Sequence, residues 1–162
     1  MKETIAVYPG SFDPFTFGHL NIIERSSKIF DKIIVSIAHN TSKNTVFSID
    51  ERVEIISEIF KESENIKVDR FEGLLVDYIR KIGTNTVLRG MRTVSDFEYE
   101  LQMANANKSI DPEIETIFMV TDSRFSYISS SLIKEIITLG GSAGHLVPEI
   151  VETKLKEKLQ TK

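Results

Sequence analysis

The fold of this chain is decided by residues 8–19, which read YPGSFDPFTFGH. The apolar run IAVY at residues 5–8 predicts a buried strand that leads into this stretch, and a helical pattern begins near Gly18. Two prolines and two glycines within the stretch indicate a sharply bent, exposed loop. Because a helix N-terminus presents free N–H groups, Gly18 and His19 in its first turn leave room for an anion against the backbone. The stretch therefore predicts phosphate binding.

A histidine at a helix start is also a common capping or surface residue, so His19 alone does not decide the function. The loop has neither the GK[ST] ending of a P-loop nor the three spaced glycines of a dinucleotide fingerprint. Residues 16–19, TFGH, instead resemble the Thr/His-x-Gly-His signature of the nucleotidyltransferase superfamily, and residues 10–14, GSFDP, precede them. This combination is far more specific than a lone Gly-His pair.

The composition is that of an ordinary globular protein. With 162 residues, the chain suits one domain over residues 1–162 that buries a sizeable core. Its net charge of −4 argues against a general surface for nucleic acid or anionic membrane, because those partners favour a basic face. The absence of cysteine excludes disulfides, thiolate catalysis and cysteine zinc sites. Without a long apolar segment or a signal-peptide core, we expect a cytoplasmic protein with no nucleic-acid or membrane partner.

Hydrophobic periodicity predicts strands that alternate with helices along the chain. Strands are expected at residues 5–8, 33–38, 66–71, 86–88 and 115–120. Helices are expected from Gly18 through Phe30, after the capping box of Ser48 and Glu51, at residues 74–82 and 94–107, after residues 129–131, and after Pro148. This order predicts an α/β fold, a single doubly wound parallel five-stranded sheet of the Rossmann-like type with a C-terminal helix. Ligands in this architecture bind at one edge of the sheet, where the loops at residues 9–19, 39–43, 71–75, 89–92 and 121–131 would open.

Several of these loops carry cationic or hydroxyl side chains that suit phosphates. Arg89 and Arg92 flank Gly90 at the end of a strand, where guanidinium groups and close backbone approach favour phosphate oxygens, although solvated arginines fit the same pattern. The serines at residues 129–131 offer hydroxyl and N–H groups at a helix start, and serines are also common helix caps. Lys43 lies in a polar loop at the same edge and is a candidate counter-charge.

Acidic and histidine residues give weaker signals. Asp96 and Glu100 place like charges four residues apart on a helix, which suggests a binding role for one of them, while an acidic first turn explains them equally well. His19, His39 and His145 are scattered without metal-ligand spacing, so we expect no metal held by the protein itself. The sequence contains no nucleophile elbow and no Cys/His pair. These features favour a reaction that depends on positioning and charge neutralisation.

From residue 5 to the last helix, the chain closely resembles the bacterial phosphopantetheine adenylyltransferase family of the nucleotidyltransferase superfamily. The matching motifs are residues 8–14 (YPGSFDP), 16–19 (TFGH), 89–92 (RGMR), 96–100 (DFEYE) and 128–135 (ISSSLIKE). The resemblance implies transfer of the adenylyl group of ATP to 4′-phosphopantetheine, which gives dephospho-coenzyme A and pyrophosphate in coenzyme A synthesis. The acceptor phosphate is already ionised near neutral pH, so it would attack the α-phosphorus in line without a general base.

The same resemblance implies roles for particular residues. The catalytic residues would be His19, Lys43 and Arg92. The residues that hold phosphopantetheine would be Ser11, Lys43, Leu75 and Arg89. The ATP site would be lined by Ser11, Phe12, His19, Gly90, Met91, Arg92, Glu100, Phe125, Ser126, Tyr127, Ile128, Ser129, Ser130 and Ser131. Ser11 and Phe125 stand where the family often has threonine and tryptophan, which would alter affinity rather than activity.

The resemblance also implies Mg²⁺ bound mainly through the ATP phosphates, a homohexamer, and feedback inhibition by coenzyme A. The sequence itself supports oligomerisation only weakly, through a thin apolar stripe on the C-terminal helix that would pack on its own domain equally well.

Two other functions stay open at this level. A nicotinate or nicotinamide mononucleotide adenylyltransferase shares the first loop and the late serine motif, although residues 89–100 and the short chain favour the pantetheine enzyme. A non-catalytic nucleotide sensor on the same fold would be expected to lack His19 or the arginines, and both are present. A glycerol-phosphate cytidylyltransferase is disfavoured, because Thr16 replaces its usual first signature histidine.

Overall fold

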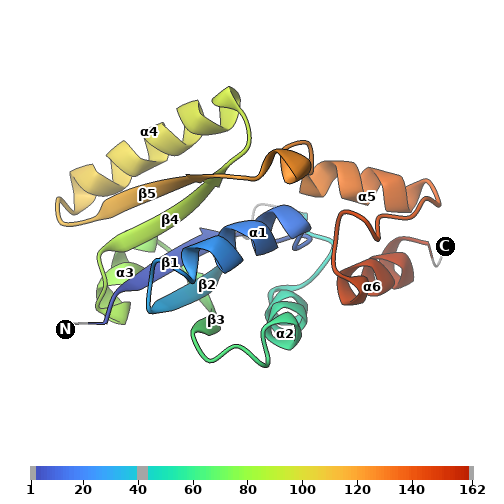
Figure 1. The fold of residues 1–162 in the computed structure, drawn as a ribbon, viewed down its shortest axis with the longest axis horizontal. Helices are drawn as coiled ribbons and strands as arrows, with labels where there is room; N and C mark the ends of the chain where they lie inside the picture. Colours follow the sequence, from blue (N-terminus) through green and yellow to red (C-terminus); the bar gives the residue numbers. More distant parts are fainter. Residues whose placement is uncertain (1–2, 40–43, 161–162) are drawn as a thin grey trace.

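The computed structural model describes residues 3–39 and 44–160. Its centre is a parallel five-stranded sheet in the order β3-β2-β1-β4-β5 (Figure 1). The strands are β1 (Ile5–Gly10), β2 (Lys32–His39), β3 (Ile66–Glu72), β4 (Thr86–Met91) and β5 (Glu115–Val120). The chain passes from central β1 outward to β3 and then crosses to β4 and β5, so the strand order reverses between β1 and β4. The predicted doubly wound α/β fold is confirmed.

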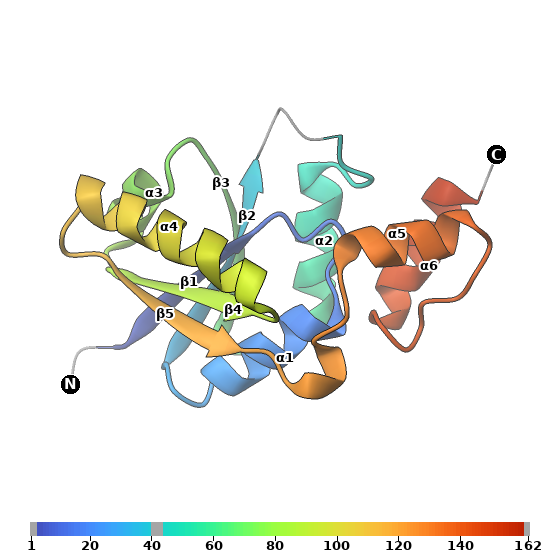
Figure 2. The same cartoon turned by 90° about the horizontal axis from the view of Figure 1, so that it is seen from above.

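Each face of the sheet buries its own set of side chains, because alternate residues of a strand point to opposite faces. Ala6 and Tyr8 of β1 join the cluster under α1 (Phe17–Ser26) and α2 (Ile49–Ile59), whereas Val7 joins the cluster under α3 (Leu75–Ile82). The helix α4 (Val94–Ile110) lies along β4 and β5 on the side of α3 (Figure 2). β1 and β2 are apolar almost throughout because helices cover both of their faces.

The last two helices, α5 (Ser130–Thr138) and α6 (Glu149–Leu159), pack against each other beyond the sheet (Figures 1 and 2). Their fully buried side chains join the α1 and α2 core; they are Ile133, Ile137, Val151 and Leu155. The amide of Phe17 donates to the carbonyl of Leu146 at 2.9 Å, which ties this region to the start of α1. Within the part of the chain that the structure describes, no helix combines the length and apolar character needed to cross a membrane.

The structure corrects the end of the first helix. Helix α1 stops at Ser26 instead of continuing to Phe30 as predicted. The hydroxyl of Ser26 donates to the carbonyl of Ile22 at 2.8 Å, and that of Ser27 donates to Glu24 at 3.0 Å. Consecutive serines compete in this way for the carbonyls of the preceding turn, which favours a helix end at this point.

Two further corrections concern the regions next to the predicted site. Strand β4 continues to Met91 instead of ending at residue 88, because Arg89 and Gly90 pair with β5. Both residues therefore stand on a rigid strand and not in a loop. Leu74, predicted as the first residue of the third helix, is instead its N-cap residue and is 56% exposed. The capping box of Ser48 at the start of α2 is confirmed.

Candidate active site

A cavity of about 340 Å³ opens at the carboxyl ends of β1 and β4, where the strand order reverses. Four segments surround it: the end of β1 with the loop after it, the end of β4 with the first turns of α4, the residue after β5, and the start of α5. Most of the lining residues belong to loops that the sequence pattern placed at the binding edge, whereas Tyr8, Asp96 and Glu100 lie outside those loops. The fold thus brings these segments together at the position where α/β sheets bind ligands.

The loop between β1 and α1 is built around the imidazole of His19. Thr16 is the N-cap of α1: its hydroxyl accepts the His19 amide at 3.3 Å, and its own amide donates to His19 Nδ1 at 3.0 Å. Because an amide N–H can only donate, Nδ1 is the unprotonated nitrogen and neutral His19 carries its ring proton on Nε2. The ring is held between Phe12 and Phe15, with centroid distances of 5.0 and 5.6 Å.

The environment keeps two polar groups of the cavity neutral. Burial, with smaller contributions from the positive charges of Arg92 and Arg89, lowers the pKa of His19 from 6.5 to about 3. The imidazole is therefore uncharged at neutral pH, and it offers its Nε2–H as a hydrogen-bond donor. Burial raises the pKa of Tyr8 well above its usual value, so the Tyr8 hydroxyl in the cavity wall stays protonated.

The guanidinium of Arg89 is fixed by three contacts inside the protein. Its Nε donates to Glu100 Oε2 at 2.6 Å, its Nη2 to Glu100 Oε1 at 2.5 Å, and its Nη1 to the Pro9 carbonyl at 2.5 Å. Glu100 is the one buried residue of α4, with 8% of its surface exposed. Its carboxylate therefore turns inward to meet Arg89 in a bidentate pair, the strong geometry for these two groups.

Arg92 links the start of α4 to the start of α5. Its Nε and Nη2 donate to the Asp96 carboxylate at 3.0 and 3.3 Å, and its Nη1 donates to the Ile128 carbonyl at 2.6 Å. Both acids that the sequence left ambiguous are thus partners of arginines. Among the described residues, no cluster of three or more His, Asp or Glu side chains is placed to hold a metal ion.

The start of α5 completes the cavity. Ser129 caps this helix by accepting the Leu132 amide at 3.1 Å, and Ser130 Oγ donates to the Pro14 carbonyl at 3.1 Å. Ser131 lines the same cavity. The first N–H groups of α5 and the imidazole of His19 therefore border one space, and the positive end of the helix dipole favours an anion there.

The cavity gathers most of the site residues that the sequence predicted. The residues that line it are Ser11, Phe12, His19, Arg89, Gly90, Arg92, Glu100, Ile128, Ser129, Ser130 and Ser131. Five predicted residues of the described chain do not line it: Leu75, Met91, Phe125, Ser126 and Tyr127. The ring of Phe125 packs on Phe17 at a centroid distance of 6.4 Å, and Tyr127 is 60% exposed. Lys43 lies outside the described residues.

Seven residues of the cavity wall are not among the predicted site residues: Tyr8, Pro9, Gly10, Thr16, Gly18, Asp96 and Thr121. The alternation along β1 contains the signal for Tyr8, since every second residue of that strand faces α1. Thr16 was considered only as part of a signature, and its contacts with His19 depend on the cap geometry of α1. Thr121 comes from the end of β5 and carries no signal of its own in the sequence.

Comparisons with known proteins agree with this geometry. The family model described as cytidylyltransferase-like matches residues 7–136. A protein of Geotalea daltonii is 54% identical over 158 residues, 98% of each chain. Proteins of Syntrophomonas wolfei and Caldanaerobacter subterraneus are 51% and 49% identical over 155 and 156 residues, which cover 96% of this chain and 96% and 98% of theirs. All three relatives are named phosphopantetheine adenylyltransferase.

Proposed function

The chain belongs to the phosphopantetheine adenylyltransferase family, and on that premise we propose that it transfers the adenylyl group of ATP to 4′-phosphopantetheine. The products are dephospho-coenzyme A and pyrophosphate, in coenzyme A synthesis. The observation that carries the proposal is the cavity at the strand-order reversal, where His19, Arg92 and the start of α5 face one space. The relatives' names do not favour a mononucleotide adenylyltransferase or a nucleotide sensor.

The geometry suits a direct displacement at the α-phosphate of ATP. The acceptor phosphate is ionised at neutral pH, so the protein needs to orient two polyanions and to stabilise charge on the transferring and leaving phosphates. Neutral His19 supplies a directed Nε2–H donor, Arg92 supplies a charged fork, and α5 supplies N–H groups. Arg89, which lines the same cavity, would face the acceptor phosphate. Donors of this kind act without a covalent intermediate.

We propose that Mg²⁺ enters the site with ATP. The two acids of the cavity, Asp96 and Glu100, are occupied by arginines. Mg²⁺ keeps several waters and is usually held by one or two carboxylates together with substrate phosphates. The donor set of the cavity therefore fits a metal carried mainly by the ATP phosphates, whose charge would assist the departure of pyrophosphate. Because ATP is the donor, the proposed reaction belongs in the cytoplasm.

We propose a homohexamer in which α4 and β5 contribute to subunit contacts. An outward helix face is normally polar, but α4 exposes a series of apolar side chains and β5 adds two more. They are Val94, Phe97, Tyr99, Leu101, Met103 and Ile110 on α4 with Ile117 and Val120 on β5. The C-terminal helix instead buries Val151 and Leu155 in its own chain. Sedimentation velocity tests the assembly, and a species of one chain at micromolar concentration would contradict it.

Pyrophosphate release tests the proposed reaction. ATP and Mg²⁺ are supplied with 4′-phosphopantetheine, nicotinate mononucleotide, nicotinamide mononucleotide or no acceptor, and the product is weighed by mass spectrometry. We expect release with phosphopantetheine alone, and inhibition by coenzyme A, which carries the same arm as the acceptor. His19→Ala should lower turnover at least about a hundredfold in a folded chain. Release with a mononucleotide, or near-normal turnover of the variant, would contradict the proposal or the role of His19.

A further inference from the structure

The peptide between Ser11 and Phe12 at the edge of the cavity is held in a strained conformation. Phe12 has a φ of +48°, and it is the one non-glycine residue with a positive φ among residues 3–39 and 44–160. The left-handed region costs free energy for a side chain that carries a Cβ atom. Rotation of the Ser11–Phe12 peptide by half a turn would change this φ by a similar amount and bring Phe12 into the ordinary extended range. Some contact must therefore prevent that rotation.

The contact comes from Arg52, a buried arginine of α2. Arg52 is 4% exposed, and its Nη1 donates to the carbonyl of Ser11 at 2.7 Å. Its Nε donates to the carbonyl of Ser48, the N-cap residue of its own helix, at 3.2 Å. The guanidinium is thus anchored at the start of α2 and reaches the loop with its remaining fork. A charged donor makes this bond stronger than one between neutral groups.

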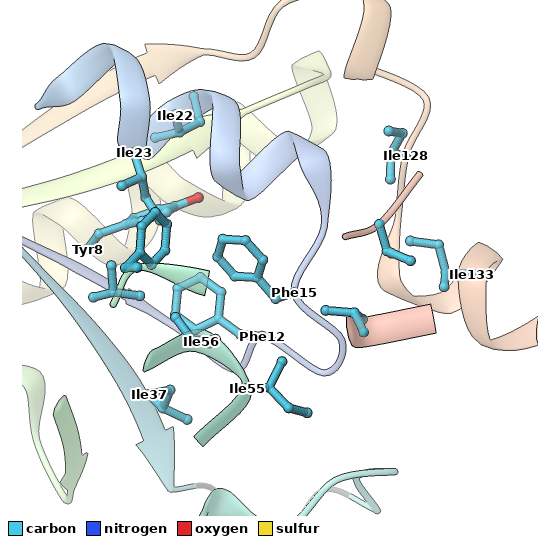
Figure 3. Packing of buried hydrophobic residues seen from close by; sticks show 14 of the residues in the cluster. Tyr8, Phe12, Phe15, Ile22, Ile23, Ile37, Ile55, Ile56, Ile128 and Ile133 are labelled. Carbon is cyan, nitrogen blue, oxygen red and sulfur yellow. The ribbon is translucent and has the colours of Figure 1, made fainter. Parts of the chain in front are cut away.

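The flanks of the same peptide are held independently. The ring of Phe12 is 3% exposed and packs against Tyr8 and Phe15 at centroid distances of 5.5 and 6.0 Å (Figure 3). After it, the carboxylate of Asp13 accepts the amides of Val46 and Phe47, each at 3.0 Å. With the Phe12 side chain and Asp13 both fixed, the orientation of the Ser11–Phe12 peptide plane depends on what its carbonyl contacts.

Peptide geometry links the carbonyl contact to the cavity. In a trans peptide the C=O and N–H bonds point in opposite directions, and among the described residues the cis bond lies elsewhere, at Asp13–Pro14. Ser11 and Phe12 line the cavity, whereas Arg52 does not and contacts the loop from the α2 side. A Ser11 carbonyl drawn toward Arg52 therefore turns the Phe12 N–H toward the cavity. The rotated peptide would present a carbonyl oxygen to the phosphates instead.

We propose that Arg52 is a positioning residue that keeps the Phe12 N–H directed at the bound phosphates, by holding the Ser11 carbonyl on the opposite side of the loop. The inference rests on the proposed function only in that the cavity binds the triphosphate or pyrophosphate. Arg52 itself does not touch the ligand. The bond from the Arg52 guanidinium to the Ser11 carbonyl offsets the free-energy cost of the positive φ at Phe12. Without this bond, the Ser11–Phe12 peptide can rotate.

The wild-type chain provides the first test. Phe12 is the one phenylalanine preceded by serine in the sequence, so ¹³C-carbonyl serine combined with ¹⁵N-phenylalanine marks the Ser11–Phe12 peptide alone. Its amide resonance is followed by NMR during titration with pyrophosphate. Pyrophosphate has no aromatic ring, so a shift of this resonance reports contact with phosphate. We expect a large shift of this resonance. An unmoved resonance at saturating pyrophosphate would overturn the inference even in an enzyme that turns over normally, so this failure is distinct from failure of the proposed function.

Substitutions of Arg52 provide the second test. Arg52→Met should weaken pyrophosphate binding about tenfold in calorimetry if about a tenth of the molecules keep the competent peptide, and the free amide resonance should move. Arg52→Lys can still donate to the Ser11 carbonyl, so it should keep most of the affinity for pyrophosphate. It is the variant to measure if Arg52→Met does not fold. Ile79→Ala on the opposite face of the sheet is the control, since it lowers stability without contact to the loop. Wild-type affinity in folded Arg52→Met would overturn the inference.

Discussion

Replacement of Glu100 by alanine should destabilise the chain strongly, because it leaves Arg89 without its bidentate partner. Removal of one member of a buried ion pair costs about 3–5 kcal/mol. The Arg89 side chain is 26% exposed and keeps its bond to the Pro9 carbonyl, so the expected loss lies near the lower limit, about 3 kcal/mol. For a domain of this size, such a loss lowers the melting temperature by about 6–12 °C.

Urea denaturation followed by circular dichroism measures this loss, and the double variant Arg89→Leu/Glu100→Leu is the matched control. A buried pair that is replaced as a whole by apolar side chains is often neutral for stability. The double variant should therefore unfold within about 1 kcal/mol of the wild type, although it loses activity. If Glu100→Ala is as stable as the wild type, or if the double variant is as unstable as the single one, Glu100 is not the partner that stabilises Arg89.

Three other predictions concern the end of β1 and the loop that follows it. Between pH 7.5 and 5 the wild type should lose more stability in urea than His19→Asn. The folded pKa of His19, about 3, lies below the unfolded value of 6.5, so the unfolded state binds a proton first as the pH falls; equal losses would contradict a neutral imidazole in the folded protein. Gly10→Ala should cost about 1–3 kcal/mol in urea, because its Cβ would lie 2.8 Å from the buried Phe12 ring, whereas Gly18→Ala, whose Cβ meets atoms at 3.4 Å or more, is the control that should cost less. Thr16→Val should cost about 1 kcal/mol through the lost cap and should lower turnover, because the hydroxyl contacts with the His19 amide and ring are lost while the Thr16 amide still donates to Nδ1; unchanged turnover would show that the hydroxyl does not orient the imidazole.

The sequence predicted the parts of this fold that depend on local pattern. Alternation and β-branched runs defined five strands, and the position of His19 in the first turn of α1 followed from the glycine and the start of the helical pattern. The edge of the sheet at which the loops open followed from parallel strand order. These features are predictable because neighbouring residues along the chain determine them.

The contacts across elements were not predictable in the same way. The pair of Arg89 and Glu100 depends on how α4 is rotated over β4, and a helix that buries a single residue gives no apolar stripe from which to read that rotation. Arg52 is 4% exposed, although charged side chains are rarely buried unless they are paired, and its burial depends on how α2 packs on the loop after β1. Leu75 and Phe125 were placed at the site by resemblance alone, and neither lines the cavity.

The two arginines of the cavity differ in how readily they can meet an anionic ligand. Arg92 and its partner Asp96 have side chains that are 35% and 26% exposed, and such a pair contributes only about 0–1 kcal/mol. A phosphate that replaces Asp96 therefore displaces a weak contact. A phosphate that replaced Glu100 would leave the buried Glu100 carboxylate without its partner, at a cost of about 3–5 kcal/mol. Arg92 is thus the cation that can exchange its carboxylate partner for the phosphates as negative charge develops on them. Arg89 keeps its pair with Glu100 in the cavity wall. Arg92→Lys should accordingly lower kcat with little change in melting temperature, since the wall keeps its buried pair; a large loss of stability would assign Arg92 to the scaffold as well.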